Sequence, residues 1–121
     1  MNRYQRLFPE EVLPNDKFYI MGKTFHVGNA DKLIKSIEHK LAKIDLNKLA
    51  QWFNEIKINK DYALNLKEPD LSIPGIYLKS NDFNFLIDGW HRAFNLFMDG
   101  ENYMKVYVID NLNEIEDITI K

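Results

Sequence analysis

The residues best suited to chemistry lie close together between Asp88 and Arg92. Asp88 can hold a metal ion, accept a hydrogen bond from a hydroxyl group, or cap a helix. Gly89 allows the backbone to approach a ligand or adopt a positive φ. His91 can donate to a phosphate or move a proton, and the Arg92 guanidinium can grip two phosphate oxygens. With Trp90 between them, these residues predict a phosphate-binding turn.

The elements around the turn support the same interpretation. An apolar strand is predicted at 83–87, and a short helix follows at 91–98, ended by Asp99 and Gly100. The first amides of a helix have no partner within the helix and carry the positive end of its dipole, so they attract anions. A purely structural interpretation also fits: Asp88 caps the helix, Gly89 makes the turn, and Arg92 lies on the surface.

The rest of the chain predicts a single α+β domain over residues 1–121, with a small mixed sheet and two to three packed helices. Residues 1–16 are expected to form an N-terminal arm that packs through Leu7, Phe8 and Val12. A hairpin is expected at 17–27, with Gly22 in its turn. The other expected elements are helices at 30–43 (capped by Asn29) and 46–56, a connector at 57–70, strands at 75–79 and 104–109, a turn at 80–82, and a weaker strand at 115–120.

The segment from 71 to 110 resembles the ParB/sulfiredoxin superfamily. The resemblance rests on the Pro-led strand at 73–79, the Gly-x-His-Arg turn after 85–88, Gly100, and the strand at 105–109. It implies a ParB/sulfiredoxin-like fold in which Gly89, Trp90, His91 and Arg92 hold the phosphates of a nucleotide. Members include nucleotide-dependent DNA-segregation proteins, sulfinic acid reductases, small-molecule kinases and proteins described as nucleases, so the family supports nucleotide binding better than one reaction.

Departures from the family pattern narrow these expectations. Trp90 stands where sulfiredoxin carries its catalytic cysteine, which argues against sulfinic acid reduction. The chain ends soon after the last expected strand, which argues against a DNA-segregation clamp. Phe94 and Asn95 replace the small residues usual in the helix, so either a remodelled site or a loss of nucleotide binding is compatible with the sequence.

Composition excludes several other classes of protein. The net charge of −2 shows no basic excess and argues against tight DNA binding. The chain has no cysteine, and hence no disulfide or thiolate site, and it shows neither a membrane-spanning apolar run nor a signal peptide. A cytoplasmic location is therefore expected. Scattered His26 and His39 make a poor metal site, and strand aromatics such as Tyr77 and Tyr107 lack the basic surround of a single-strand binder.

Two functions from different classes stay open. The first is nucleotide or phosphate binding, extended to phosphoryl transfer or nucleotide hydrolysis if Mg²⁺ bridges a nucleoside triphosphate and Asp88. In that case Asp88 and His91 are the catalytic candidates and Arg92 clamps the phosphate. The second is a small phage or mobile-element accessory protein that binds a protein partner and keeps the turn only as a scaffold.

Overall fold

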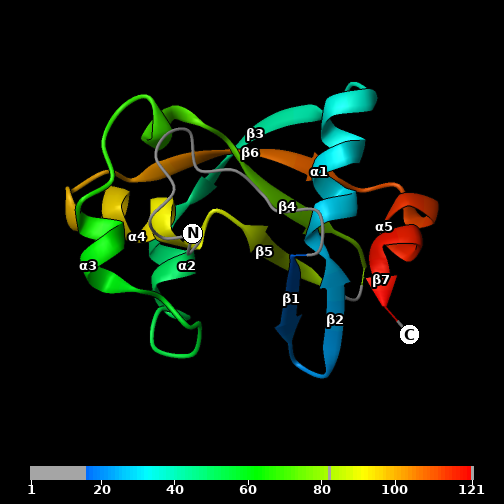
Figure 1. Cartoon of the computed structure of the whole chain (residues 1–121), viewed down its shortest axis with the longest axis horizontal. Helices are drawn as coiled ribbons and strands as arrows, with labels where there is room; N and C mark the ends of the chain where they lie inside the picture. The colour runs from blue at the N-terminus through cyan, green and yellow to red at the C-terminus, as the bar shows by residue number, and fades with distance from the viewer. Residues whose placement is uncertain (1–15, 82, 121) are drawn as a thin grey trace.

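The protein is a mixed α+β structure with two sheets. The computed structural model describes residues 16–81 and 83–120, and this part of the chain holds five α-helices and seven strands. One sheet has the strand order β1-β2-β7 and the other β3-β6-β4-β5 (Figure 1). The predicted α+β class is confirmed, with more helices than the two or three expected. The expected arm, including Leu7, Phe8 and Val12, lies outside the described residues, as does Asp82 of the expected turn.

The three-stranded sheet is built on the predicted hairpin. β1 (Lys17–Ile20) pairs antiparallel with β2 (Lys23–His26), and β7 (Thr119–Ile120) joins the other edge of β2. The turn places Met21 at φ 50° and Gly22 at φ 76°. Two consecutive positive φ angles match the right-handed twist of a hairpin, and glycine adopts one of them without steric cost.

The four-stranded sheet carries the turn singled out above. β4 (Gly75–Lys79) pairs antiparallel with β5 (Asn84–Asp88) and parallel with β6 (Tyr103–Ile109), while β3 (Lys40–Asp45) lies antiparallel to β6 at the edge. The helix α4 (Trp90–Met98) connects β5 to β6. The strands expected at 75–79, 83–87 and 104–109 and the helix at 91–98 are thus confirmed to within about one residue.

The helix expected at 30–43 is wrong in its second half. α1 (Val27–Ser36) is capped by His26, whose Nδ1 accepts from Asn29 N, and not by Asn29. Ile37 already has an extended backbone, and β3 then pairs with β6 along its whole length. Leu33, Ile34 and Ile37 do recur at helical spacing, but the long-range pairing with β6 decides the conformation of the residues that follow.

The helix expected at 46–56 and the strand expected at 115–120 are also corrected. α2 (Leu46–Ala50) is a short helix followed by turns, and the connector holds α3 (Lys60–Leu64) and a 3₁₀ turn, Asp70–Ser72. Near the C-terminus, Asn111 caps α5 (Leu112–Ile118), which leaves only two residues for β7. Local capping by Asn111 outweighs the strand propensity of the isoleucines.

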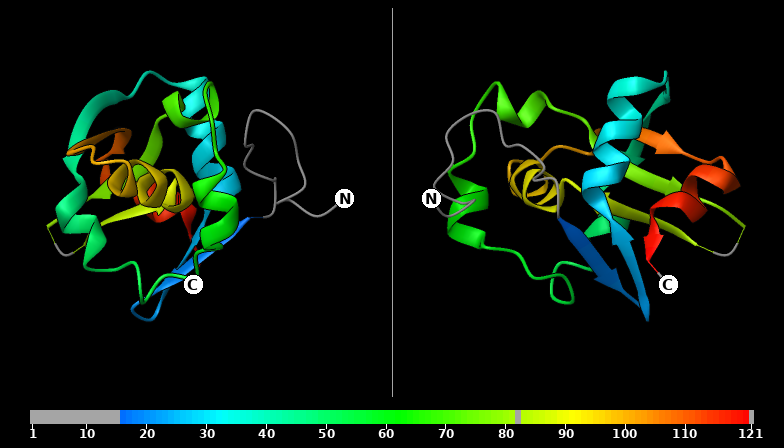
Figure 2. Two further views of the ribbon diagram at one scale, coloured as in Figure 1. Left: turned by 90° about the vertical axis from the view of Figure 1, so that its left-hand side faces the viewer. Right: turned by 45° about the vertical axis from the view of Figure 1, so that its right-hand side comes forward.

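The helices gather at two ends of the four-stranded sheet. α2, α3 and α4 lie together at one end, and α1 and α5 at the other, near the three-stranded sheet (Figures 1 and 2). Between them, Phe85 contacts Phe18 of β1, Trp52 after α2, and Trp90 of α4. This aromatic cluster joins the β5–α4 turn to elements distant in sequence. None of the described helices has the length and apolarity that crossing a membrane requires.

Candidate functional site

The β5–α4 turn has a geometry that requires glycine. Gly89 has φ 105°, in the left-handed region that L side chains rarely adopt. A Cβ at this position would lie 3.0 Å from Met104 Cε and 3.2 Å from Gly75 Cα, so space is short as well. Gly89 also leaves α4 without a side-chain cap, whereas the other four described α-helices have one. The first amides of α4 are therefore not covered by a capping side chain.

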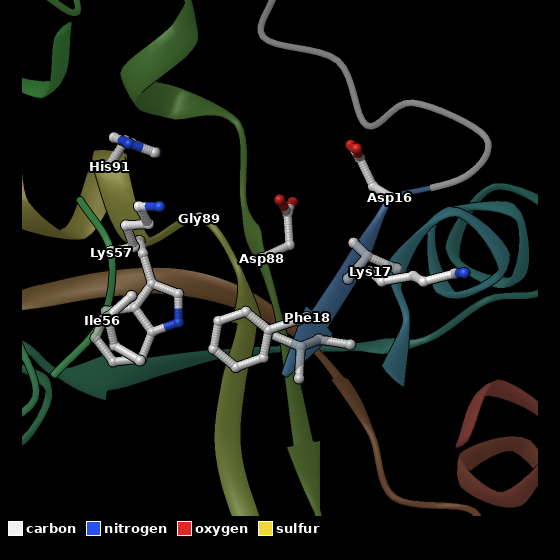
Figure 3. A pocket seen from close by; sticks show the side chains of 11 residues that line it. Asp16, Lys17, Phe18, Ile56, Lys57, Asp88, Gly89 and His91 are labelled. Carbon is white, nitrogen blue, oxygen red and sulfur yellow. The ribbon is translucent and has the colours of Figure 1, made fainter. Parts of the chain in front are cut away.

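A pocket of about 140 Å³ opens at this end of α4. Its walls come from the β5–α4 turn, the start of β1 and of α1, and the segment that follows α2. Figure 3 shows His91 and Lys57 on one side of the pocket and the carboxylates of Asp88 and Asp16 on the other, while the amino group of Lys17 points away. Lys57 thus gives the wall next to the helix a positive charge, and Asp88 and Asp16 give the opposite wall a negative one.

The His91 imidazole is held in one tautomer. Its Nε2 lies 3.1 Å from the backbone nitrogen of Asn59, which donates to it. A nitrogen that accepts a hydrogen bond carries no proton, so the ring proton is on Nδ1. Tyr62 supports the ring with an edge-on contact at 5.3 Å between centroids. His91 is therefore a donor through Nδ1, and Nε2 can act as a base only if the contact with Asn59 breaks.

Arg92 is buried, whereas the purely structural interpretation of the sequence placed it on the surface. Its side chain is 2% exposed, and it does not line the pocket. Nη1 donates to the carbonyls of Ile73 (2.7 Å) and Pro74 (3.2 Å), and Nη2 donates to Asp88 Oδ2 (3.0 Å). These bonds fasten α4 to the segment that leads into β4. The phosphate clamp expected of Arg92 stays a prediction, and it requires the guanidinium to exchange these partners for a ligand.

Trp90 and Asp88 also make structural contacts. Trp90 is buried, and its indole Nε1 donates to Leu86 O at 2.8 Å. Asp88 is 13% exposed on its side chain, so its carboxylate reaches the pocket while one oxygen accepts from Arg92. Asp88 does not cap α4. Its availability to a metal ion or a hydroxyl group depends on the remaining oxygen.

Three residues of the site were not predicted from the sequence. Lys57 and Asn59 lie in the expected connector, and Asp16 precedes the hairpin. Each reaches the turn only through tertiary packing, and no local pattern in the sequence marks it. The positive charge of the pocket therefore comes from Lys57, which nothing in the sequence sets apart from the other lysines of the chain.

The remaining polar candidates have structural partners. His26 caps α1, and His39 bonds through Nδ1 to Ile37 O and through Nε2 to Glu114 of α5. Across residues 16–81 and 83–120, no three histidine or acidic side chains are grouped in a way that could hold a metal ion alone. A metal at the pocket would need oxygens from its ligand as well.

The comparisons with known proteins leave the family of this chain open. No family model, curated protein or solved structure matches it.

Proposed function

We propose that this protein binds a phosphorylated small molecule, with a nucleotide as the leading candidate, and holds its phosphoryl group at the N-terminus of α4. The observation that carries the proposal is the meeting of an uncapped helix start with Lys57 and His91 in one pocket. Amides and a helix dipole attract an anion, and a lysine and a histidine donor beside them add charge-assisted hydrogen bonds. The resemblance of residues 71–110 to the ParB/sulfiredoxin superfamily suggests the same ligand class.

The size of the pocket limits how the ligand is held. Pockets that enclose a whole drug-sized ligand have volumes of roughly 300–1,000 Å³, whereas this pocket has about 140 Å³. A phosphoryl group fits that space, and the sugar and base of a nucleotide would lie outside it. We therefore expect modest selectivity among nucleobases, with affinity set mainly by the phosphates.

Mg²⁺ fits the anionic wall only together with a ligand. Mg²⁺ is commonly held by one or two carboxylates plus the phosphates of a substrate. Asp88 and Asp16 line the wall opposite Lys57, which suits an ion placed between carboxylates and phosphate (Figure 3). Asp88 would be the first ligand, and Mg²⁺ there would neutralise charge on the phosphate. A cytoplasmic nucleoside triphosphate with its bound Mg²⁺ would supply both the phosphate and the metal ion.

The proposal extends to phosphoryl transfer or nucleotide hydrolysis, with His91 and Asp88 as the residues that would take part. In this form of the proposal, His91 donates to a phosphate oxygen in exchange for one of its present contacts. Asp88, where its remaining oxygen does not hold Mg²⁺, accepts the proton of an attacking hydroxyl or water. Binding without turnover is compatible with the same geometry. Release of inorganic phosphate from ATP, CTP or GTP, lost in Asp88→Asn, distinguishes the two.

A thermal-shift experiment tests the binding proposal. ATP, CTP and GTP, each with and without Mg²⁺, should raise the melting temperature, since a ligand at about 100 times its Kd stabilises the folded state by roughly 2.7 kcal/mol. Lys57→Ala should reduce the rise. Lys48→Ala is the matched control, because Lys48 is exposed on α2 and lies outside the pocket. If no nucleotide shifts the wild type at millimolar concentration, the proposal fails and the protein-binding alternative gains weight.

A further inference from the structure

A second cationic surface lies on β3 and β6, away from the pocket at α4. Lys43 of β3 and Lys105 of β6 are directly opposite each other in the antiparallel pairing, and both are exposed. Directly opposite residues on one face have Cβ atoms about 4.5–5.5 Å apart. The two amino groups can therefore reach the same small anion.

This lysine pair has no compensating partner in the described part of the chain. Neither side chain forms an ion pair or a hydrogen bond with another described residue. Glu101 lines the hollow beside them without forming an ion pair, and Asp45 accepts from the backbone of Asn47 to cap α2. Like charges directly opposite each other destabilise a sheet. A bound anion would remove this cost.

Protection of the sheet edge explains only half of the arrangement. Lysines on edge strands discourage pairing with other chains, which accounts for Lys43 and for Lys40 on β3. Lys105 lies on β6, an inner strand of the sheet, so edge protection does not explain it. Tyr103, two residues before Lys105 on the same face, is 59% exposed.

The hollow next to this pair has a volume of about 250 Å³ and is lined by Lys43, Tyr103 and Lys105 among others. It therefore offers two ammonium groups for a phosphate and an exposed aromatic ring for a planar base, the combination by which single nucleotides and single strands are held on sheets. The basic surround that the sequence did not reveal is created by the pairing of β3 with β6.

We propose that the hollow at Lys43, Tyr103 and Lys105 is a separate nucleotide-binding site, with the phosphate between the two lysines and the base against Tyr103. The shared chemistry is that of a nucleotide, supplied either as a free monophosphate or as part of a single strand. The site does not use Lys57 or His91, so it stands independently of the pocket at α4.

Two probes distinguish the two sources of ligand. AMP is titrated into the ¹⁵N-labelled protein and followed by the amide signals of Tyr103 and Lys105. A fluorescein-labelled oligothymidylate of about eight nucleotides, within the usual size of single-strand sites, is followed by anisotropy at low ionic strength. Tyr103→Leu should weaken binding about fivefold or more, the effect of losing one stacked base. Lys43→Gln and Lys105→Gln should each lower the salt dependence of oligonucleotide binding by about 0.7 in log–log slope.

Lys40→Gln is the matched control, because Lys40 is exposed on the same strand but in register with Val108, on the opposite face. Binding of either probe that is weakened by the three site variants and kept in Lys40→Gln supports the site, and the probe that binds identifies the source. The proposal is overturned if neither probe binds, if the site variants bind normally, or if Lys40→Gln loses as much affinity as Lys43→Gln. Lys57→Ala should bind both probes as the wild type does, because Lys57 lies outside this hollow. The result is expected whether or not the pocket at α4 binds a ligand.

Discussion

Replacement of Arg92 by alanine is the perturbation that best separates a structural from a ligand-binding role for this side chain. The guanidinium makes two bonds to the carbonyls of Ile73 and Pro74 and one to Asp88, and it is almost fully buried. Alanine removes all three bonds and leaves a carboxylate and two carbonyl oxygens without these donors. It also opens space beneath the turn.

The expected loss of stability follows from these contacts. Removing one partner of a buried ion pair costs about 3–5 kcal/mol. Asp88 is 13% exposed, so water can solvate part of its carboxylate, and the lower end of the range applies. For 121 residues the total stability is roughly 6–18 kcal/mol. We therefore expect Arg92→Ala to fold but to lose about 3 kcal/mol, or roughly 10 °C in melting temperature.

Urea denaturation followed by the fluorescence of Trp52 and Trp90 measures this loss. Arg92→Lys should recover only part of it, because an ammonium group lacks the fixed fork that reaches a carboxylate and carbonyls together. Lys48→Ala, an exposed control, should change stability by less than about 0.5 kcal/mol. The reasoning is refuted if Arg92→Ala loses less than about 1 kcal/mol while the nucleotide-induced shift disappears, since Arg92 would then act on the ligand.

Two further variants test the turn and the core. Gly89→Ala should destabilise the protein by about 2–3 kcal/mol, because φ 105° is strained for alanine and its Cβ would meet Met104 and Gly75. Gly22→Ala is the control: Gly22 has φ 76° but open space around it, so the substitution should cost only about 1 kcal/mol. Equal losses of stability in the two variants would contradict the crowding at Gly89. Burial raises the pKa of Tyr77 above its ordinary value of 10.0, so the folded state keeps that proton longer than the unfolded state, and the stability it contributes below pH 10 is lost as the pH rises beyond it. Tyr77→Phe should flatten the fall in stability above pH 10 in denaturation curves, and an unchanged alkaline slope would exclude Tyr77 as its source.

The elements predicted correctly are those whose signals are local. The hairpin around Gly22, the strands on either side of residue 80 and the helix that ends at Met98 all have turn residues at their boundaries and clear apolar patterns. The turn at Gly89 belongs to the same class, since a glycine between an apolar strand and an amphipathic helix predicts either a positive φ or a close approach of the backbone. The position of this turn could therefore be predicted without any tertiary contact, whereas the crowding of Gly89 by Met104 and Gly75 could not.

The elements and residues that were missed depend on long-range contacts. The backbone of β3 is extended because β6, about 60 residues later, pairs with it, and this pairing also brings Lys43 next to Lys105. Likewise, Lys57 and Asn59 reach the turn because α2 and α3 pack against α4. A pattern of residue types along the chain carries no information on which of many lysines will be neighbours.

The side chains of the turn divide into those that fix it and those that a ligand can reach. Arg92 bonds to backbone carbonyls away from the pocket. Trp90 lines the pocket, but its indole N–H is bonded to Leu86 O, whereas His91 faces the pocket with its tautomer set by Asn59. Successive helical residues are about 100° apart, so one turn can serve both purposes. A turn held rigid in this way binds an anion without paying to order its amides first. It follows that loss of ligand binding in an Arg92 variant that is also destabilised would not establish a contact with phosphate, because the same loss is expected when the amides lose their fixed positions. Lys57→Ala, which leaves the bonds of Trp90 and Arg92 intact, is the substitution whose effect reports on direct contact with the ligand.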